Sequence, residues 1–334
     1  MNSSMQQSKK KKLPINRQSV IQSIKNPVFV SFILIVMLFI AGEFISPGFA
    51  SGPQIIRLLT IAALLGFVAA GQNLVILGGQ EGIDLSVGGM VSMGAVIAGN
   101  IMHGNNSMIL WAFIGSISFC AAIGFVNGMG ILLLRIPPLV MTLGMLGVIQ
   151  GGLVVVTSGA PSGNAAPMLM SFITKPLLFN LPGVLWIWAS LGALMWILLY
   201  KTAFGLKVYA IGSNEQATKL TGISVGMTRV ILYMSSGAFA GFTGICLIGY
   251  TGSSFIGVGE QYMLSSIIAV VIGGTSLAGG IGNYFGTIMG ATLLVVLQSI
   301  LTTLNMEDFG RQIIFGMTLL ILMFFYGRGK KLRN

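Results

Sequence analysis

The chain has 334 residues, of which 54% are hydrophobic and only 7% are charged. Because a soluble globular domain carries about 25% charged residues, this composition excludes an ordinary soluble protein. Long uncharged runs recur from residue 27 to residue 326 and predict an all-α, polytopic membrane protein. The net charge of +11 comes from basic residues that flank these runs, which is a topology signal. We therefore expect no nucleic-acid partner.

Ten apolar runs of helical length follow one another along the chain. They cover residues 27–45, 54–77, 85–102, 108–134, 139–156, 183–200, 230–250, 263–277, 285–304 and 311–326. The eighth run is short for a hydrocarbon core of about 30 Å. It is expected to be a broken helix whose polar end lines a cavity.

The distribution of basic residues predicts the topology. If the N-terminus is cytoplasmic, ten spans place both tails and 15 of the 18 Lys and Arg residues inside the cell, as the positive-inside rule requires. The three exceptions are Arg57, Lys175 and Arg311. Residues 1–26 and 327–334 are then cytoplasmic basic tails around a transmembrane domain, 27–326. The first tail is expected to lie on anionic lipid. Loop 157–182 is extracytoplasmic and loop 201–229 is cytoplasmic.

The longest polar interruption, residues 201–229, contains a short predicted helix from Asn214 to Thr221. Ser213 and Gln216 have the spacing of a capping box at its start. Gly222 suits the left-handed residue that ends a helix.

The predicted helix has a small apolar face, because Ala217 and Leu220 are three residues apart. An exposed helix of this kind between membrane spans is typical of an element that docks into a partner's groove. The alternative is a loop helix lying on lipid headgroups, and the spacing leaves both open.

Several spans contain amide side chains, which are costly in lipid and must face protein or a cavity. The candidates for lining a translocation path are Gln72, Asn73, Asn127 and Gln150. The alternative is that these amides form hydrogen bonds between helices. Because they are neutral, a path that they line suits an uncharged polar solute better than an ion.

Two glycine-rich breaks, residues 78–89 and 270–286, each contain paired glycines, a hydroxyl and a leucine, and both fall on the cytoplasmic side of the predicted topology. In the first break, Glu81 and Asp84 are expected at the membrane edge, and Ser86 follows. Asp84 precedes an apolar run, so it is expected to cap the start of the third span. A direct contact with substrate is the alternative.

The chain lacks the motifs of an enzyme. It has no GxxxxGK[ST] phosphate loop, one histidine, and two cysteines that lie far apart in apolar segments. We expect no metal site, no cofactor in this chain and no catalytic residues. A transporter without its own energy source needs a partner that supplies work.

The chain resembles the permease subunits of bacterial monosaccharide ABC importers, with the ribose, xylose and galactose permeases as the nearest relatives. The resemblance covers nearly the whole chain. The stretches that carry it are NLVILGGQEGIDLSVGGMVSMGAVIAG (73–99), VTSGAP (156–161), AIGSNEQATKLTGI (210–223) and AVVIGGTSLAGGIGNYFGTIMGA (269–291).

The resemblance implies a ten-helix permease that works as a pair, with a second copy that is identical or a paralogue. It also implies a cytoplasmic ATP-binding subunit that uses ATP and Mg, and an extracytoplasmic solute-binding protein. The residues similar to the ATPase-coupling loop of such permeases are Asn214, Glu215, Ala217 and Gly222.

The sequence departs from the family pattern at two places. The coupling segment reads E-Q-A-x4-G instead of the E-A-A-x3-G of the wider importer class. Gln80 and Glu81 are inserted into the GGIDLSVG motif, which could mark a substrate subgroup unlike ribose.

Together these features predict the permease subunit of an ATP-driven importer in the bacterial plasma (inner) membrane, which carries a neutral monosaccharide or a sugar-like solute by alternating access. One alternative is the same machinery importing a nucleoside or a furanone-like signal. The other is a transporter or channel that works alone.

Overall fold

The computed structural model describes residues 27–79, 82–160 and 163–327. Of the predicted tails 1–26 and 327–334, only Gly327 is among these residues, and Gln80, Glu81, Pro161 and Ser162 also lie outside them. The long helices in chain order are α2 (Pro27–Ile45), α3 (Gly52–Leu77), α4 (Val87–Met102), α5 (Ile109–Leu133), α6 (Pro138–Thr157), α8 (Gly183–Lys201), α11 (Val225–Thr251), α12 (Gln261–Ile272), α13 (Tyr284–Thr303) and α14 (Asp308–Gly327).

Each of the ten apolar runs forms one helix, which confirms the predicted fold class. In the described part of the chain, seven helices are long and apolar enough to cross a membrane, and α4 and α12 are shorter. The expectation of a short eighth segment is confirmed, because α12 has 12 residues and spans about 18 Å at a rise of ~1.5 Å per residue. Non-helical segments lie before and after α12.

The two long loops contain more structure than predicted. The loop at 157–182 holds α7 (Pro167–Thr174) and a hairpin of β1 (Pro176–Leu178) and β2 (Leu181–Pro182). The loop at 201–229 holds two helices, α9 (Ala203–Ser213) and α10 (Glu215–Leu220). The next helix, α11, begins at Val225, so the span predicted from residue 230 starts five residues too late.

Helix α3 forms the centre of the bundle. It contacts α8, α11, α12 and α13, and 89% of its apolar window is buried inside the protein. A helix that is apolar all round must be covered by protein or lipid. The peripheral helices α2 and α6 have only 17% of their windows buried, so their exposed apolar faces suit lipid.

Glycines set the distance between α5 and α11. A methyl group on Gly237 would lie 2.1 Å from the backbone oxygen of Cys120, and one on Gly124 would lie 2.1 Å from the backbone oxygen of Tyr233. These helices therefore pack backbone against backbone, which small residues permit.

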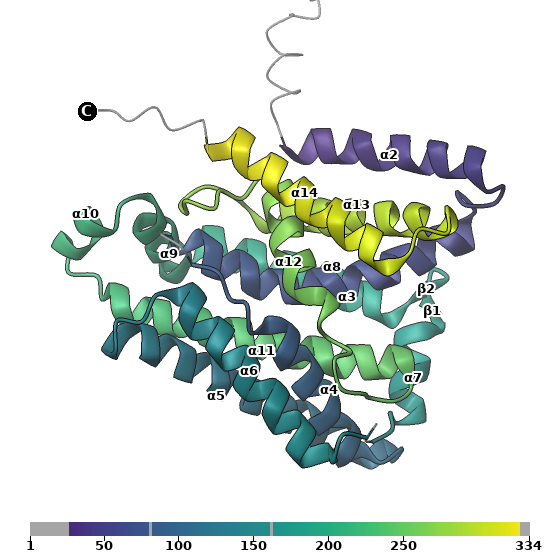
Figure 1. The fold of residues 1–334 in the computed structure, drawn as a ribbon, viewed down its shortest axis with the longest axis horizontal. Coiled ribbons are helices and arrows are strands. Elements are labelled where there is room, and N and C mark those ends of the chain that lie inside the picture. Colours follow the sequence, from purple (N-terminus) through teal and green to yellow (C-terminus); the bar gives the residue numbers. More distant parts are fainter. Residues whose placement is uncertain (1–26, 80–81, 161–162, 328–334) are drawn as a thin grey trace, which may run out of the picture.

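The bundle has two distinct ends (Figure 1). Helices α9 and α10 and the turn between α5 and α6 lie at one end, called here the α10 end. Helix α7 and the β1–β2 hairpin lie at the other, called here the α7 end. The first residue of α2, Pro27, packs against Gly274 near the α10 end, and α14 runs back toward that end (Figure 1).

The three basic residues predicted to be exceptions to the positive-inside rule all lie at the α7 end. Lys175 ends α7, Arg57 lies beside Tyr250 in a cavity described below, and Arg311 donates a hydrogen bond to Thr302 in the same cavity. Among the described residues, these three basic side chains therefore lie at the end opposite to α10, where the predicted topology expects them.

The close packing of α5 and α11 predicts a large difference between two glycine substitutions. Gly237→Ala should destabilise the protein by about 1–3 kcal/mol, because the new methyl group meets backbone that cannot move aside alone. Gly147→Ala on α6 is the matched control, since no atom lies within 4 Å of its new methyl group. Thermal unfolding in detergent measures the difference, and equal melting temperatures would contradict this account of the helix crossing.

Candidate functional site

Helix α10 is held at both ends by local backbone geometry. The Asn214 side chain accepts a hydrogen bond from the Ala217 backbone N–H at 3.0 Å, and Gly222 has a left-handed φ of +81°. The predicted left-handed glycine is therefore confirmed, but the predicted capping box of Ser213 and Gln216 is wrong. Ser213 is the last residue of α9, whereas Asn214 has the extended backbone that an N-cap requires.

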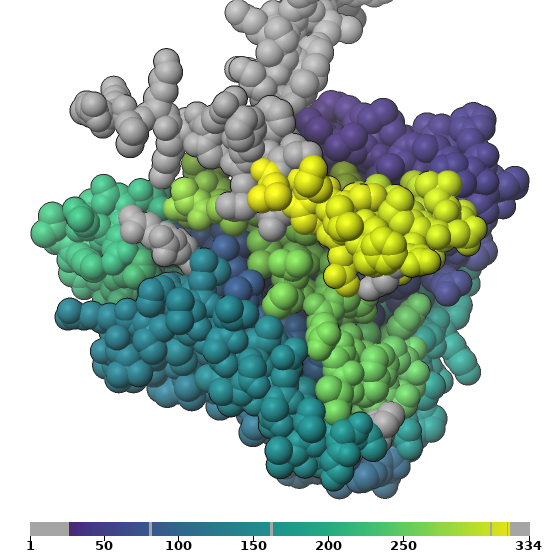
Figure 2. All heavy atoms as spheres, viewed as in Figure 1, coloured from purple at the N-terminus to yellow at the C-terminus, as the bar shows by residue number. Residues whose placement is uncertain are grey.

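The apolar face of α10 is open. Ala217 and Leu220 are both exposed, and Leu220 exposes 90% of its surface, whereas Thr218 on the other face is buried. The segment stands out from the body at the α10 end (Figure 2). This arrangement fits docking into a separate groove, because nothing in the described chain covers the two apolar side chains.

Glu215, the first residue of α10, joins the helix to α11. Its carboxylate accepts hydrogen bonds from Lys219 at 2.7 Å and from Arg229 of α11. Partial burial acts to raise the pKa of Glu215, but the bond from Lys219 and the charge of Arg229 outweigh burial and hold it below its ordinary value. Because the folded-state pKa is lowered, the cluster is intact at neutral pH and is lost only as the pH falls through that lowered value.

Four glycines connect the α9–α10 segment to the core, and we call them the glycine junction: Gly79, Gly212, Gly279 and Gly280. A methyl group on Gly212 would lie 2.0 Å from the backbone oxygen of Leu77, and one on Gly279 would lie 2.4 Å from Gly79 Cα. The Gly280 N–H donates to the backbone oxygen of Leu77 at 3.0 Å. The two glycine-rich breaks of the sequence therefore meet each other and α9 directly.

Asp84 lies inside the bundle, and its predicted position at the membrane edge stays a prediction. It is completely buried, and its carboxylate accepts hydrogen bonds from the Ser86 hydroxyl at 2.6 Å and from Ser236 of α11 at 2.8 Å. Asp84 also accepts the Ser86 backbone N–H at 3.0 Å, so its carboxylate caps a backbone donor at the start of α4 as predicted, although the residue directly before α4 is Ser86, whose side chain makes no cap bond. Asn127 of α5 donates to Ser86 at 2.9 Å, and the group ties the start of α4 to α5 and α11.

The four predicted path residues make contacts between segments. Asn73 donates to Thr275 at 2.9 Å and to Thr287 at 3.0 Å, and the Gln72 amide pairs with the Asp84 backbone at 3.2 Å. Gln72, Asn73 and Asn127 are completely buried, whereas Gln150 is partly exposed and donates to Glu260 at 3.2 Å. These bonds match the alternative of interhelical hydrogen bonding. A role in the path stays a prediction.

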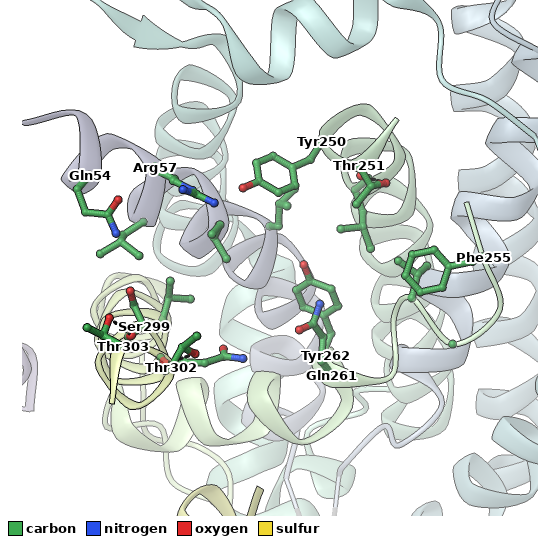
Figure 3. Close-up of a pocket in the computed structure, with 18 residues that line it drawn as sticks. Gln54, Arg57, Tyr250, Thr251, Phe255, Gln261, Tyr262, Ser299, Thr302 and Thr303 are labelled. Atoms are coloured by element: carbon green, nitrogen blue, oxygen red, sulfur yellow. Dashed lines mark hydrogen bonds between the residues drawn. The ribbon is translucent and has the colours of Figure 1, made fainter. Parts of the chain in front are cut away.

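A cavity of about 670 Å³ opens among α3, α11, α12 and α13 at the α7 end (Figure 3). Its polar lining consists of one cation, amides and hydroxyls: Arg57, Gln54, Gln261, Gln298, Tyr250, Tyr262, Thr251, Ser299, Thr302 and Thr303. Apolar side chains such as Phe255 complete the wall. Such a mixture can bind a compact solute rich in hydroxyl groups, with hydrogen bonds at its edges and apolar contact at its faces.

Sequence reasoning missed most of this cavity. None of the four predicted path amides lines it, although its position at the start of the short α12 agrees with the predicted broken helix. The polar lining residues lie near the ends of spans, where polar side chains are expected in any case. Gln298 is the exception, because it is an amide within an apolar run.

Comparisons with known proteins agree with this architecture. Residues 54–323 match the family described as "Branched-chain amino acid transport system / permease component". No solved structure matches the chain.

Curated relatives are similar over nearly the full length. The chain is 32% identical to the ribose import permease protein RbsC of Escherichia coli (strain K12), over 87% of this chain and 91% of that protein. It is 32% identical to RbsC of Bacillus subtilis (strain 168), over 88% and 90%. It is 30% identical to the autoinducer 2 import system permease protein LsrC of Escherichia coli (strain SMS-3-5 / SECEC), over 91% and 87%. The chain therefore belongs to this permease family, and it is a multi-pass membrane permease of the ABC importer type.

Proposed function

We propose that this permease forms the membrane path for import of a neutral monosaccharide or a closely similar polyol. Relatives named for ribose import support this solute class, as does a cavity lined mainly by amides and hydroxyls. Arg57, the one charged residue among the described residues of the lining, carries several N–H donors that can bind the hydroxyl oxygens of such a solute.

A separate ATPase subunit supplies the work by docking on α10, which faces the cytoplasm. The observation that supports this step is the exposed apolar face of α10, formed by Ala217 and Leu220. The Asn214 cap and the ion pairs of Glu215 hold the helix in place. The chain works with a second permease copy and receives solute from a binding protein at the α7 end.

The path opens alternately to the two sides. Movement of α10 is transmitted in two ways. Glu215 pulls on Arg229 at the start of α11. Gly212 presses on the Leu77 end of α3 and on Gly280 in the 270–286 break. Because α11 and α3 both line the cavity at the far end, a tilt of these helices changes its opening.

Removal of the docking side chain should weaken the assembly. Leu220→Ala should reduce binding of the ATPase subunit about ten- to hundredfold, because burying a leucine contributes roughly 1.5–3 kcal/mol. Phe179→Ala is the matched control, an 87% exposed apolar residue at the α7 end. Co-purification of the ATPase subunit with each variant measures the effect, and equal recovery with both variants would remove α10 from the docking surface.

Accessible cysteines should report the orientation of the two ends. Ser299→Cys in the cavity should react with a membrane-impermeant maleimide in intact cells, and Thr221→Cys beside α10 should react only after permeabilisation. Background labelling by the maleimide should be low, because the two native cysteines, Cys120 and Cys246, are both fully buried. Labelling of Thr221→Cys in intact cells would reverse the proposed topology.

A further inference from the structure

A second cavity, of about 240 Å³, lies beside α10 between the end of α5 and the start of α11. Three cations and one carboxylate line it: Arg135, Lys219, Arg229 and Glu215. The cavity is separate from the exposed docking face of α10, because neither Ala217 nor Leu220 is part of its lining.

Among the residues that the structure describes, the charges of this cavity do not balance. Glu215 contacts Lys219 and Arg229, whereas Arg135 makes no ion pair within the described part of the chain. Arg135 also has a left-handed backbone with φ of +55°, which is unfavourable for a residue with a side chain. A net positive cavity that keeps an arginine in this conformation is suited to an anion.

The surroundings of the cavity indicate where the anion comes from. Leu133 and Leu134 at the end of α5 expose 66% and 71% of their surfaces, and Met227 at the start of α11 exposes 51%. Exposed apolar side chains on spanning helices contact lipid acyl chains. The cavity therefore borders an exposed apolar surface that suits lipid acyl chains.

We propose that this cavity binds the phosphate of an anionic phospholipid headgroup, with Arg135 and Lys219 as its principal contacts. Basic pockets between transmembrane helices bind such headgroups through charge and hydrogen bonds. The bound phosphate supplies the missing negative charge and holds the end of α5, helix α10 and the start of α11 together. An acidic side chain of the ATPase subunit is the competing occupant, but it does not explain the lipid-exposed border.

The test measures lipid retention on the purified full-length permease. The probes are phosphatidylglycerol and phosphatidylcholine with identical acyl chains, and the readout is native mass spectrometry. The wild-type protein should retain phosphatidylglycerol about tenfold better than phosphatidylcholine, and the double variant Arg135→Gln, Lys219→Gln should lose this preference. Arg135→Lys, Lys219→Arg should keep it, which shows that charge and not folding is responsible.

The control removes two positive charges from loop 201–229, which also contains Lys219, and leaves the cavity lining unchanged. Lys201→Gln, Lys207→Gln should retain phosphatidylglycerol as the wild type does, because neither lysine lines the cavity. Equal retention by the cavity variant and the control would overturn the proposal. So would unchanged lipid retention combined with loss of ATPase-subunit binding, because the cavity would then serve a carboxylate of that subunit. The lipid assay needs neither the ATPase nor solute, so its outcome is independent of the proposed function.

Discussion

The glycine junction is the contact on which the rest of the architecture depends. At this point the end of α3, the end of α9 and the 270–286 break meet through backbone atoms, and no side chain separates them. Any side chain would push the segments apart, because the space beyond each Cα is already filled by another backbone. In the proposed function, this contact transmits a displacement of the α9–α10 segment to the central helix instead of absorbing it.

Beyond the junction, hydrogen bonds and close backbone packing join the helices into units. The buried amides Gln72, Asn73 and Asn127 form hydrogen bonds between segments, and the hydroxyls of Ser86 and Ser236 satisfy the buried Asp84 carboxylate. Backbone packing between α5 and α11 fixes a second unit. Polar groups in the core therefore hold helices in register, and they leave open the larger cavity at the far end, which is the proposed solute site.

The fold followed from the sequence because apolar run length and basic residue placement report directly on spans and their direction. The ten helices and the broken α12 were predictable for this reason, as was the left-handed Gly222. The cap of α10 was misassigned because Ser213 and Asn214 are both good capping residues, and only the tertiary course of α9 decides between them. The contacts of Asp84 with Ser236 and of Leu77 with Gly280 join residues more than 100 positions apart, and no local pattern reports contacts between residues so far apart in the sequence. The cavity residues were missed because polar side chains at span ends have an ordinary explanation.

The most direct test of the central claim is the number of solute molecules transported per ATP hydrolysed in proteoliposomes that hold the assembled importer. Gly212→Ala places a methyl group against the backbone of Leu77 and Gly280, so it should separate α9 from the core while leaving the docking face of α10 intact. With equal amounts of complex recovered, hydrolysis should continue and transport per ATP should fall, whereas Gly316→Ala, which meets no atom within 4 Å, should behave as the wild type does. An unchanged ratio in Gly212→Ala would contradict the claim that motion passes through this junction.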